Sequence, residues 1–139
     1  MTAPLDLFHS AVHARDIDAA LKALANLDDQ ATAPLLAKLL LEHWHEAHED
    51  IVFELGLIGE PSTTAATARA TEMRFEYLID WDNLHAFQHK CAYALARIGT
   101  TESKVALELM AKHSDPMLRE YGQEGPDHWP IPYKGNRSR

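Results

Sequence analysis

A short apolar motif that recurs along the chain constrains the fold more than any other feature. It reads Ala-Leu-Ala-Asn-Leu-Asp at 23–28, Glu-Leu-Gly-Leu-Ile-Gly at 54–59 and Ala-Leu-Ala-Arg-Ile-Gly at 94–99. The leucines that share one place in the motif, Leu24, Leu55 and Leu95, are 31 and then 40 residues apart. Repetition at such periods is typical of stacked units that bury one face against their neighbours. The sequence therefore predicts a series of helical hairpins.

Capping residues and the spacing of apolar residues place the first two hairpins. Helices are expected over 5–14 and, after an Asp16 N-cap, through residue 27. Thr32 is the expected cap of a helix over 33–43, with Pro34 in its first turn. Its partner is expected over 46–57, where Gly59 and the proline that follows end it.

The later hairpins follow the same signals. A helix is expected to open at Ser62 or Thr63 and to pass through Tyr77, and its partner is expected over 84–98. The middle interval of the repeat, 40 residues against 31, leaves nine extra residues within 71–83, so we expect a lengthened helix there and a projecting loop after it. Thr101 and the Asp-Pro pair at 115–116 open two more helices, the last expected to end near 123, before regular structure fails after Gly125.

These motifs, together with Asp-Pro-Met-Leu-Arg at 115–119, resemble the HEAT-like repeats first named from phycobilin lyases. The second helix of that repeat starts with Asp-Pro-x-Val-Arg and ends with Ala-Leu-Gly-x-Ile-Gly. The resemblance covers residues 13–124 and implies an all-α fold, a right-handed α-solenoid of four or so HEAT-like helical hairpins. It divides the chain into a helical repeat domain, 1–124, and a Pro-rich carboxy-terminal tail, 125–139. The same repeat supports scaffolds, inhibitors, lyases and some metal enzymes, so it implies no single activity.

The charge of the chain favours a basic partner. The 139 residues include 13 Lys and Arg against 21 Asp and Glu, a formal net charge of −8. No Lys or Arg occurs between Lys38 and Arg69, a window that holds six acidic residues. Such a surface repels nucleic acid and anionic lipid and attracts basic proteins.

Cysteine content and hydropathy favour a cytoplasmic protein. The single Cys91 has no partner for an intrachain disulfide, and the first residues lack the basic and apolar regions of a signal peptide. The most apolar stretch, 34–41, is interrupted by Lys38 and is far shorter than the roughly 20 residues of a membrane span. We therefore expect no membrane association.

Histidines and carboxylates raise the alternative of a metal-binding HEAT-like enzyme. The chain has nine histidines, and five lie between His43 and His89. His45 and Glu49 are four residues apart, as are His85 and His89, so two stacked helices would bring the four side chains together. Histidines on a solvated, acid-rich face are the simpler interpretation, and we assign no metal, cofactor or catalytic residue. Cys91 is expected to be buried and inert.

The repeat frame also predicts a binding surface. Four-residue steps place His45, Glu49 and Phe53 on one stripe of a second helix, and the next repeat supplies His85, His89 and Tyr93. In this repeat class the stripe commonly faces solvent on the concave side. Exposed aromatic residues among acids are typical of a protein-binding hot spot. The alternative is that the tail covers Phe53 and Tyr93 with its own Trp129, Ile131 and Tyr133.

The sequence thus predicts a protein-binding module without catalytic activity. Small acidic single-domain proteins often act as inhibitors, which includes immunity proteins that neutralise a basic toxin. A self-assembling structural subunit is the other alternative, with a homodimer formed through Leu5, Phe8 and Val12. The expected partner-binding residues are His45, Glu49, Asp50, Phe53, Asp80, Trp81, Asp82, His85, His89 and Tyr93.

Overall fold

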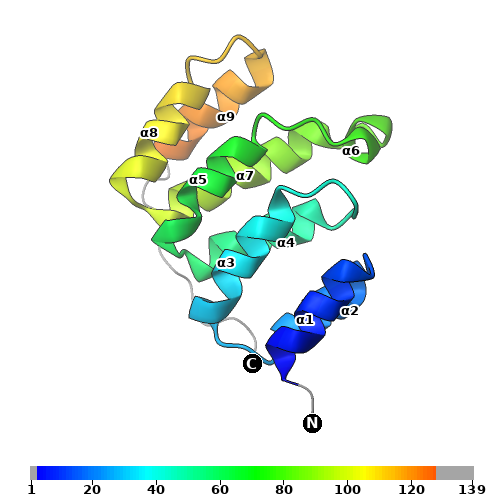
Figure 1. Ribbon diagram of the computed structural model, residues 1–139. Helices are drawn as coiled ribbons and strands as arrows, with labels where there is room; N and C mark the ends of the chain where they lie inside the picture. Colours follow the sequence, from blue (N-terminus) through cyan, green and yellow to red (C-terminus); the bar gives the residue numbers. More distant parts are fainter. Residues whose placement is uncertain (1–2, 128–139) are drawn as a thin grey trace.

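A computed structural model describes residues 3–127, and this part of the chain is all-helical (Figure 1). It contains nine α-helices, one short 3₁₀ helix and no strand in the described range. The helices are α1 (Pro4–His13), α2 (Ile17–Leu24), α3 (Asp29–Leu40), α4 (His48–Ile58), α5 (Thr64–Ala70), α6 (Glu76–Asp80), α7 (Leu84–Ile98), α8 (Thr101–Met110) and α9 (Pro116–Asp127), with the 3₁₀ helix η1 (Pro61–Thr63) before α5.

Successive helices pair, and the pairs lie side by side (Figure 1). α1 packs on α2, α3 on α4, α5 on α7 and α8 on α9. Between pairs, α4 contacts α7 and α7 contacts α9, while α3 contacts α5 and α5 contacts α8. From the second pair onward, one layer is therefore made of α3, α5 and α8, and the other of α4, α7 and α9.

The recurring motif occupies equivalent places in α4 and α7. Leu55 and Leu95 are fully buried, and their carbonyl groups accept the backbone N–H of Gly59 and Gly99 at 2.9 and 3.3 Å. Both glycines adopt positive φ, 69° and 71°, the left-handed conformation that glycine enters without a Cβ clash. The predicted ends of these two helices are confirmed to within one residue.

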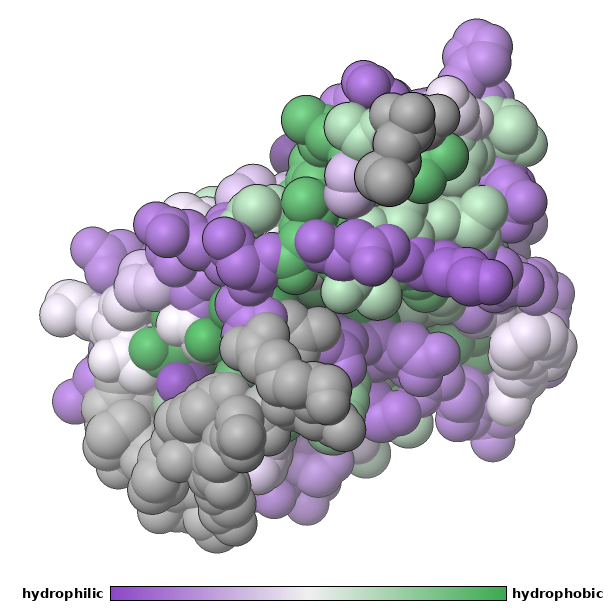
Figure 2. Space-filling view, turned by 90° about the horizontal axis from the view of Figure 1, so that it is seen from below, coloured by the Kyte–Doolittle hydropathy of each residue, from purple (hydrophilic) through white to green (hydrophobic). Residues whose placement is uncertain are grey.

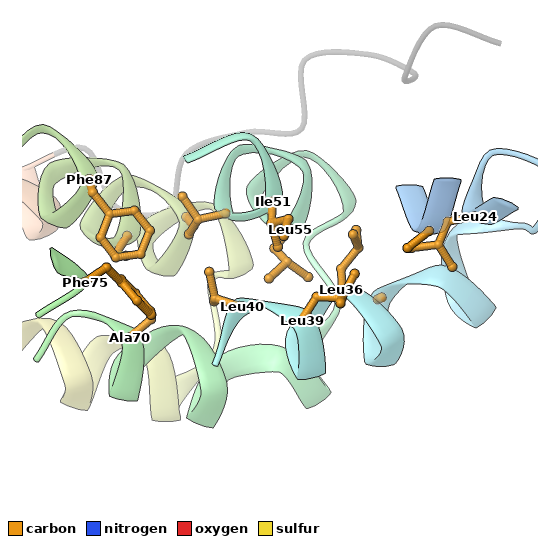
Figure 3. Close-up of a cluster of buried hydrophobic side chains, with 14 of the residues drawn as sticks. Leu24, Leu36, Leu39, Leu40, Ile51, Leu55, Ala70, Phe75 and Phe87 are labelled. Carbon is orange, nitrogen blue, oxygen red and sulfur yellow. The ribbon is translucent and has the colours of Figure 1, made fainter. Parts of the chain in front are cut away.

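Buried apolar side chains run through the pairs as one continuous cluster (Figure 3). It extends from Leu24 in α2, past Leu36 in α3 and Leu55 in α4, to Phe75 and Phe87. A smaller cluster joins α7 to the last two helices through Leu95, Leu107 and Leu118, with other members besides. Each pair thus buries apolar surface against the next one, which stabilises the stack by the hydrophobic effect.

The second hairpin begins earlier than predicted. The carboxylate of Asp28 accepts a hydrogen bond from Ala31 N at 2.8 Å and caps α3, so the helix starts at Asp29 and Pro34 lies inside it. The Thr32 hydroxyl instead contacts the carbonyl oxygen of Leu24 in α2 at 3.4 Å. The Asp16 cap is confirmed, since its side chain accepts from Ala19 N at 3.1 Å.

Residues 71–83 do not lengthen a helix, in contrast to the prediction. α5 ends at Ala70, and a separate short helix, α6, follows before a turn at Asp82, which has a φ of 55°. The break lets Phe75 turn into the core, where it is buried. At the other end of the chain, α9 continues through Gly125 to Asp127, beyond the predicted limit.

The face of α1 predicted for a homodimer is only partly exposed. Leu5 is exposed, but Phe8 is buried within its own chain and Val12 packs against the core. Figure 2 shows a face on which hydrophilic side chains predominate and smaller hydrophobic areas lie between them. None of the helices in the described range is both long and apolar enough to span a bilayer.

Candidate functional site

A groove between α4 and α7 holds the two aromatic residues singled out by the sequence. Phe53 and Tyr93 are 54% and 46% exposed, large fractions for apolar side chains in a folded domain. Both line a hollow of about 230 Å³, here called the α4–α7 groove. Its other lining residues are Val52, Gly56, Leu57, His89, Lys90, Ala94 and Arg97. Phe53 and Tyr93 thus lie on one surface in the described part of the chain, whereas the predicted alternative of tail coverage concerns residues outside it.

At the floor of the groove, α4 and α7 approach each other closely. A Cβ added at Gly56 would lie 3.2 Å from the Ala94 Cα and 3.3 Å from its Cβ, tighter than most real contacts. Arg97 reinforces the approach, because its Nε donates a hydrogen bond to the Gly56 carbonyl oxygen at 3.0 Å. The glycine of the recurring motif therefore sets the depth of the groove as well as the packing of α4 on α7.

Glu49 lies near the start of α4 and fastens it to α7. One carboxylate oxygen accepts from Asn83 Nδ2 at 2.6 Å, and the other lies 2.8 Å from Lys90 Nζ. The Lys90 charge is thereby balanced within the chain. The carboxylate predicted to meet a partner is instead engaged at both oxygens in joining two helices.

The remaining predicted acids and Trp81 are available to solvent. Asp50 is exposed beside a second hollow of about 210 Å³, which α4 shares with α2 and α3. Asp80, the last residue of α6, forms an exposed segment with Trp81 and Asp82, here called the 80–82 turn, before α7 begins. Trp81 is 61% exposed, and its ring meets that of Tyr77 edge-on, with centroids 5.1 Å apart.

His45 is not on the predicted stripe. The repeat frame places a helix over 46–57, but α4 starts only at His48, and His45 belongs to the turn before it. Its Nδ1 accepts from Ala47 N at 3.1 Å, so its Nε2 carries the proton and donates to the carbonyl oxygen of Leu39 at 2.7 Å. Buried and bonded at both nitrogens, His45 joins the end of α3 to the start of α4 and cannot meet a partner.

His48 and Tyr77 form a buried network that sequence reasoning missed. His48 Nε2 donates to the Glu42 carbonyl oxygen at 2.6 Å, which leaves Nδ1 to accept from the Tyr77 hydroxyl at 2.7 Å. That hydroxyl also accepts the His48 backbone N–H at 3.2 Å. The imidazole stacks on Phe75 with ring centroids 3.7 Å apart. Residues 44–48, Trp-His-Glu-Ala-His, stand where the repeat's second helix would start with Asp-Pro-x-Val-Arg, and their departure from that start was the only hint of an irregular turn here.

Burial controls the protonation of this network. It lowers the pKa of His48 to about 4, and the nearby His45 and His43 act in the same direction. Burial also lowers the pKa of His45. It raises the pKa of Tyr77 to about 12. All three side chains are therefore neutral near pH 7, as the hydrogen bonds require.

The two predicted histidines of α7 are exposed and contact polar neighbours. His85 Nδ1 lies 3.0 Å from the Gln88 side-chain oxygen. His89 stacks on Tyr121 of α9 with centroids 4.6 Å apart, and its Nε2 lies 3.3 Å from a Glu124 oxygen. These contacts connect the edge of the α4–α7 groove to the last helix.

The four residues of the metal alternative do not converge. His45 is directed to Leu39, Glu49 to Asn83 and Lys90, and His89 to Glu124. Within residues 3–127, no three His, Cys, Asp or Glu side chains are grouped so that they could hold a metal ion. The packing of α4 on α7 thus places the cationic side chain of Lys90 where a metal site would need a ligand.

Cys91 lies in the core, as predicted. It is a free thiol and fully buried on the inner face of α7. Burial raises the pKa of the thiol well above its usual range. The thiolate, the reactive form, is therefore suppressed at neutral pH.

Comparison with the sequence models of known families, with curated proteins and with solved structures finds no match to this chain. The resemblance to HEAT-like repeats therefore depends on the motif residues alone.

Proposed function

We propose that the protein is a non-catalytic helical-repeat protein that binds a basic protein partner through the α4–α7 groove and the 80–82 turn. In this proposal the chain is a right-handed α-solenoid of HEAT-like hairpins located in the cytoplasm. The observation that carries the proposal is the pair of exposed aromatics, Phe53 and Tyr93, on either side of one groove. Aromatic side chains in such positions supply most of the energy at protein interfaces.

The charge around the groove supports a basic partner. Lys90 is balanced by Glu49, and Arg97 donates to a backbone carbonyl in the groove floor. The exposed acids Asp50, Asp80 and Asp82 form no ion pair in the described residues. Opposite charges across an interface accelerate association and select against acidic competitors.

An inhibitor of a basic protein, such as an immunity protein, is the most specific form of the proposal. Its support is the combination of a small acidic chain and a preformed groove. An inhibitor of this kind needs only to occlude its target, so a rigid stack with two aromatic anchors is sufficient.

The test compares variants in a capture experiment from the lysate of the native organism. Bait proteins are the wild type, Phe53→Ser with Tyr93→Ser, and Asp80→Lys with Asp82→Lys. The matched control changes α1 instead, with Asp6→Lys and Leu7→Ser, both exposed and outside the groove. Bound proteins are identified by mass spectrometry, and their affinities are then measured with purified components.

The proposal predicts a basic protein that the wild type and the α1 control retain and that both groove variants lose. Its affinity should fall as salt rises, since exposed charges are screened. Equal retention by all four baits, or no partner for the wild type, contradicts the proposal.

A further inference from the structure

The outer face of α8 exposes two large aliphatic side chains. Val105 is 49% and Leu109 is 65% exposed, whereas Leu107 and Met110 of the same helix are buried. Residues 105 and 109 are one helical turn apart and lie on the same side of α8. Neither residue belongs to the α4–α7 groove.

Two hollows lined by residues of α5 and α8 border this face. The first, of about 550 Å³, is lined by residues of α5 and α8 that include Ala65, Glu102 and Val105. The second, of about 570 Å³, includes Arg69 and Lys112. Ala68, Ala106 and Leu109 line both hollows. Small alanine side chains thus leave room beside α8 for side chains of another helix.

The charges at the two ends of α8 complement each other when the helix is reversed. Glu102 lies in the first turn of α8, and Lys112 lies two residues beyond its last residue, Met110. Both charged residues are exposed and form no ion pair in the described part of the chain. In an antiparallel pair of such helices, each end therefore places an acid opposite a base.

We propose that α8 forms a two-fold interface with α8 of a second copy of this chain. An antiparallel pair centred at position 107 places Val105 opposite Leu109 of the second copy and Glu102 opposite its Lys112. A two-fold axis requires such a self-complementary surface, in which each contact occurs twice. The apolar pair fills the centre of the interface and the ion pairs lie at its rim, which is the usual arrangement.

The experiment is sedimentation velocity on the full chain from about 1 μM to about 1 mM, the range of weak to moderate affinities. The wild type is expected to convert from monomer to dimer within this range. Leu109→Glu is expected to raise the dimer dissociation constant by about a hundredfold or more, because two charges enter the apolar centre. Glu102→Lys and Lys112→Glu are each expected to weaken the dimer by about tenfold, since each change acts twice.

The double variant Glu102→Lys with Lys112→Glu is the decisive case. It exchanges the two charges and is expected to return dimerisation to within a few-fold of the wild type. The control Leu7→Glu, on the exposed face of α1, should leave the dimer unchanged. Circular dichroism confirms folding of each variant, which is expected because every substitution is on the surface.

Three results would overturn the interface. They are a wild type that stays monomeric up to the highest concentration, a dimer that Leu109→Glu does not weaken, and a double variant that is weaker than both single variants. The groove variant Phe53→Ser with Tyr93→Ser should dimerise normally. Failure of the α8 dimer and failure of partner binding are therefore separate outcomes.

Discussion

The imidazole of His48 and the hydroxyl of Tyr77 lie 2.7 Å apart and join the first turn of α4 to α6. Because the same hydroxyl accepts the His48 backbone N–H, one side chain satisfies two polar groups of one buried residue. The contact fixes both α6 and the 80–82 turn beside the N-terminus of α7. It connects the stability of the stack to the position of a proposed binding residue, Trp81, whose ring contacts Tyr77.

Removing the hydroxyl should destabilise the fold. Tyr77→Phe leaves the ring but strands the Nδ1 and backbone N–H of His48 without a partner, at a cost of about 1–3 kcal/mol in the free energy of unfolding. Urea denaturation followed by circular dichroism measures the loss. Tyr93→Phe is the matched control, since Tyr93 is exposed and should change stability by less than about 0.5 kcal/mol. Equal urea midpoints for the two variants would show that the hydrogen bonds of the Tyr77 hydroxyl contribute no net stability.

Stability should fall in mild acid. The folded pKa of His48, about 4, lies below the ordinary value of 6.5, so the unfolded chain binds more protons between these two values. The contribution of His48 to the free energy of unfolding is fully present above about pH 6.5. It is lost as the pH falls toward 4, by up to about 3 kcal/mol. His45, whose pKa is also lowered, adds to the effect.

Urea denaturation at about pH 7.5 and at about pH 4.5 measures this loss. His48→Gln should be less stable at the higher pH and should show a smaller difference between the two. An imidazole of His48 that titrates near 6.5 in the folded protein, as seen by NMR, would contradict the burial argument.

Closing the space at Gly56 should separate α4 from α7. Gly56→Val adds side-chain atoms where a Cβ alone already lies 3.2 Å from the Ala94 Cα, so we expect a loss of about 1–3 kcal/mol. Gly59→Ala is a useful comparison, because the added Cβ would meet no close neighbour and only the φ of 69° is unfavourable. Its cost should be about 1 kcal/mol. Thermal unfolding of both variants separates crowding from backbone strain, and a neutral Gly56→Val would refute the close packing.

Cys91 should react only when the chain unfolds. The thiol is fully buried and its pKa is raised by burial, so a thiol reagent should leave it unmodified in native buffer at pH 7.5 or so. Labelling should become complete in denaturant. Mass spectrometry counts the modified fraction, and rapid labelling of the native protein would indicate that α7 opens.

Local signals allowed some of the fold to be predicted. The bounds of α7 follow from its apolar spacing and from Gly99, and the Asp16 cap follows from a carboxylate placed before an apolar run. The exposure of Phe53 and Tyr93 could also be predicted from the sequence, because residues four apart on one helix share a face wherever the helix forms. These signals act within a few residues of chain and need no distant contact.

The errors occur where distant contacts compete with local signals. Thr32 is a good N-cap by type, yet Asp28 caps α3 and the Thr32 hydroxyl contacts the preceding helix. His45 has suitable spacing for a helical stripe, yet the polar ends of α3 and α4 draw it inward. Hydrogen bonds to buried backbone groups stabilise this fold more than one further turn of helix would.

The sequence by itself determined the helical hairpins, their order and the glycine ends of α4 and α7, because hydrophobic periodicity and glycine conformation are local properties. The tertiary structure decided which of the predicted side chains remain exposed. Glu49 and His45 became packing residues, while Phe53, Tyr93 and Trp81 remained exposed. That division depends on which helix lies against which, and buried polar groups must find partners wherever the packing places them.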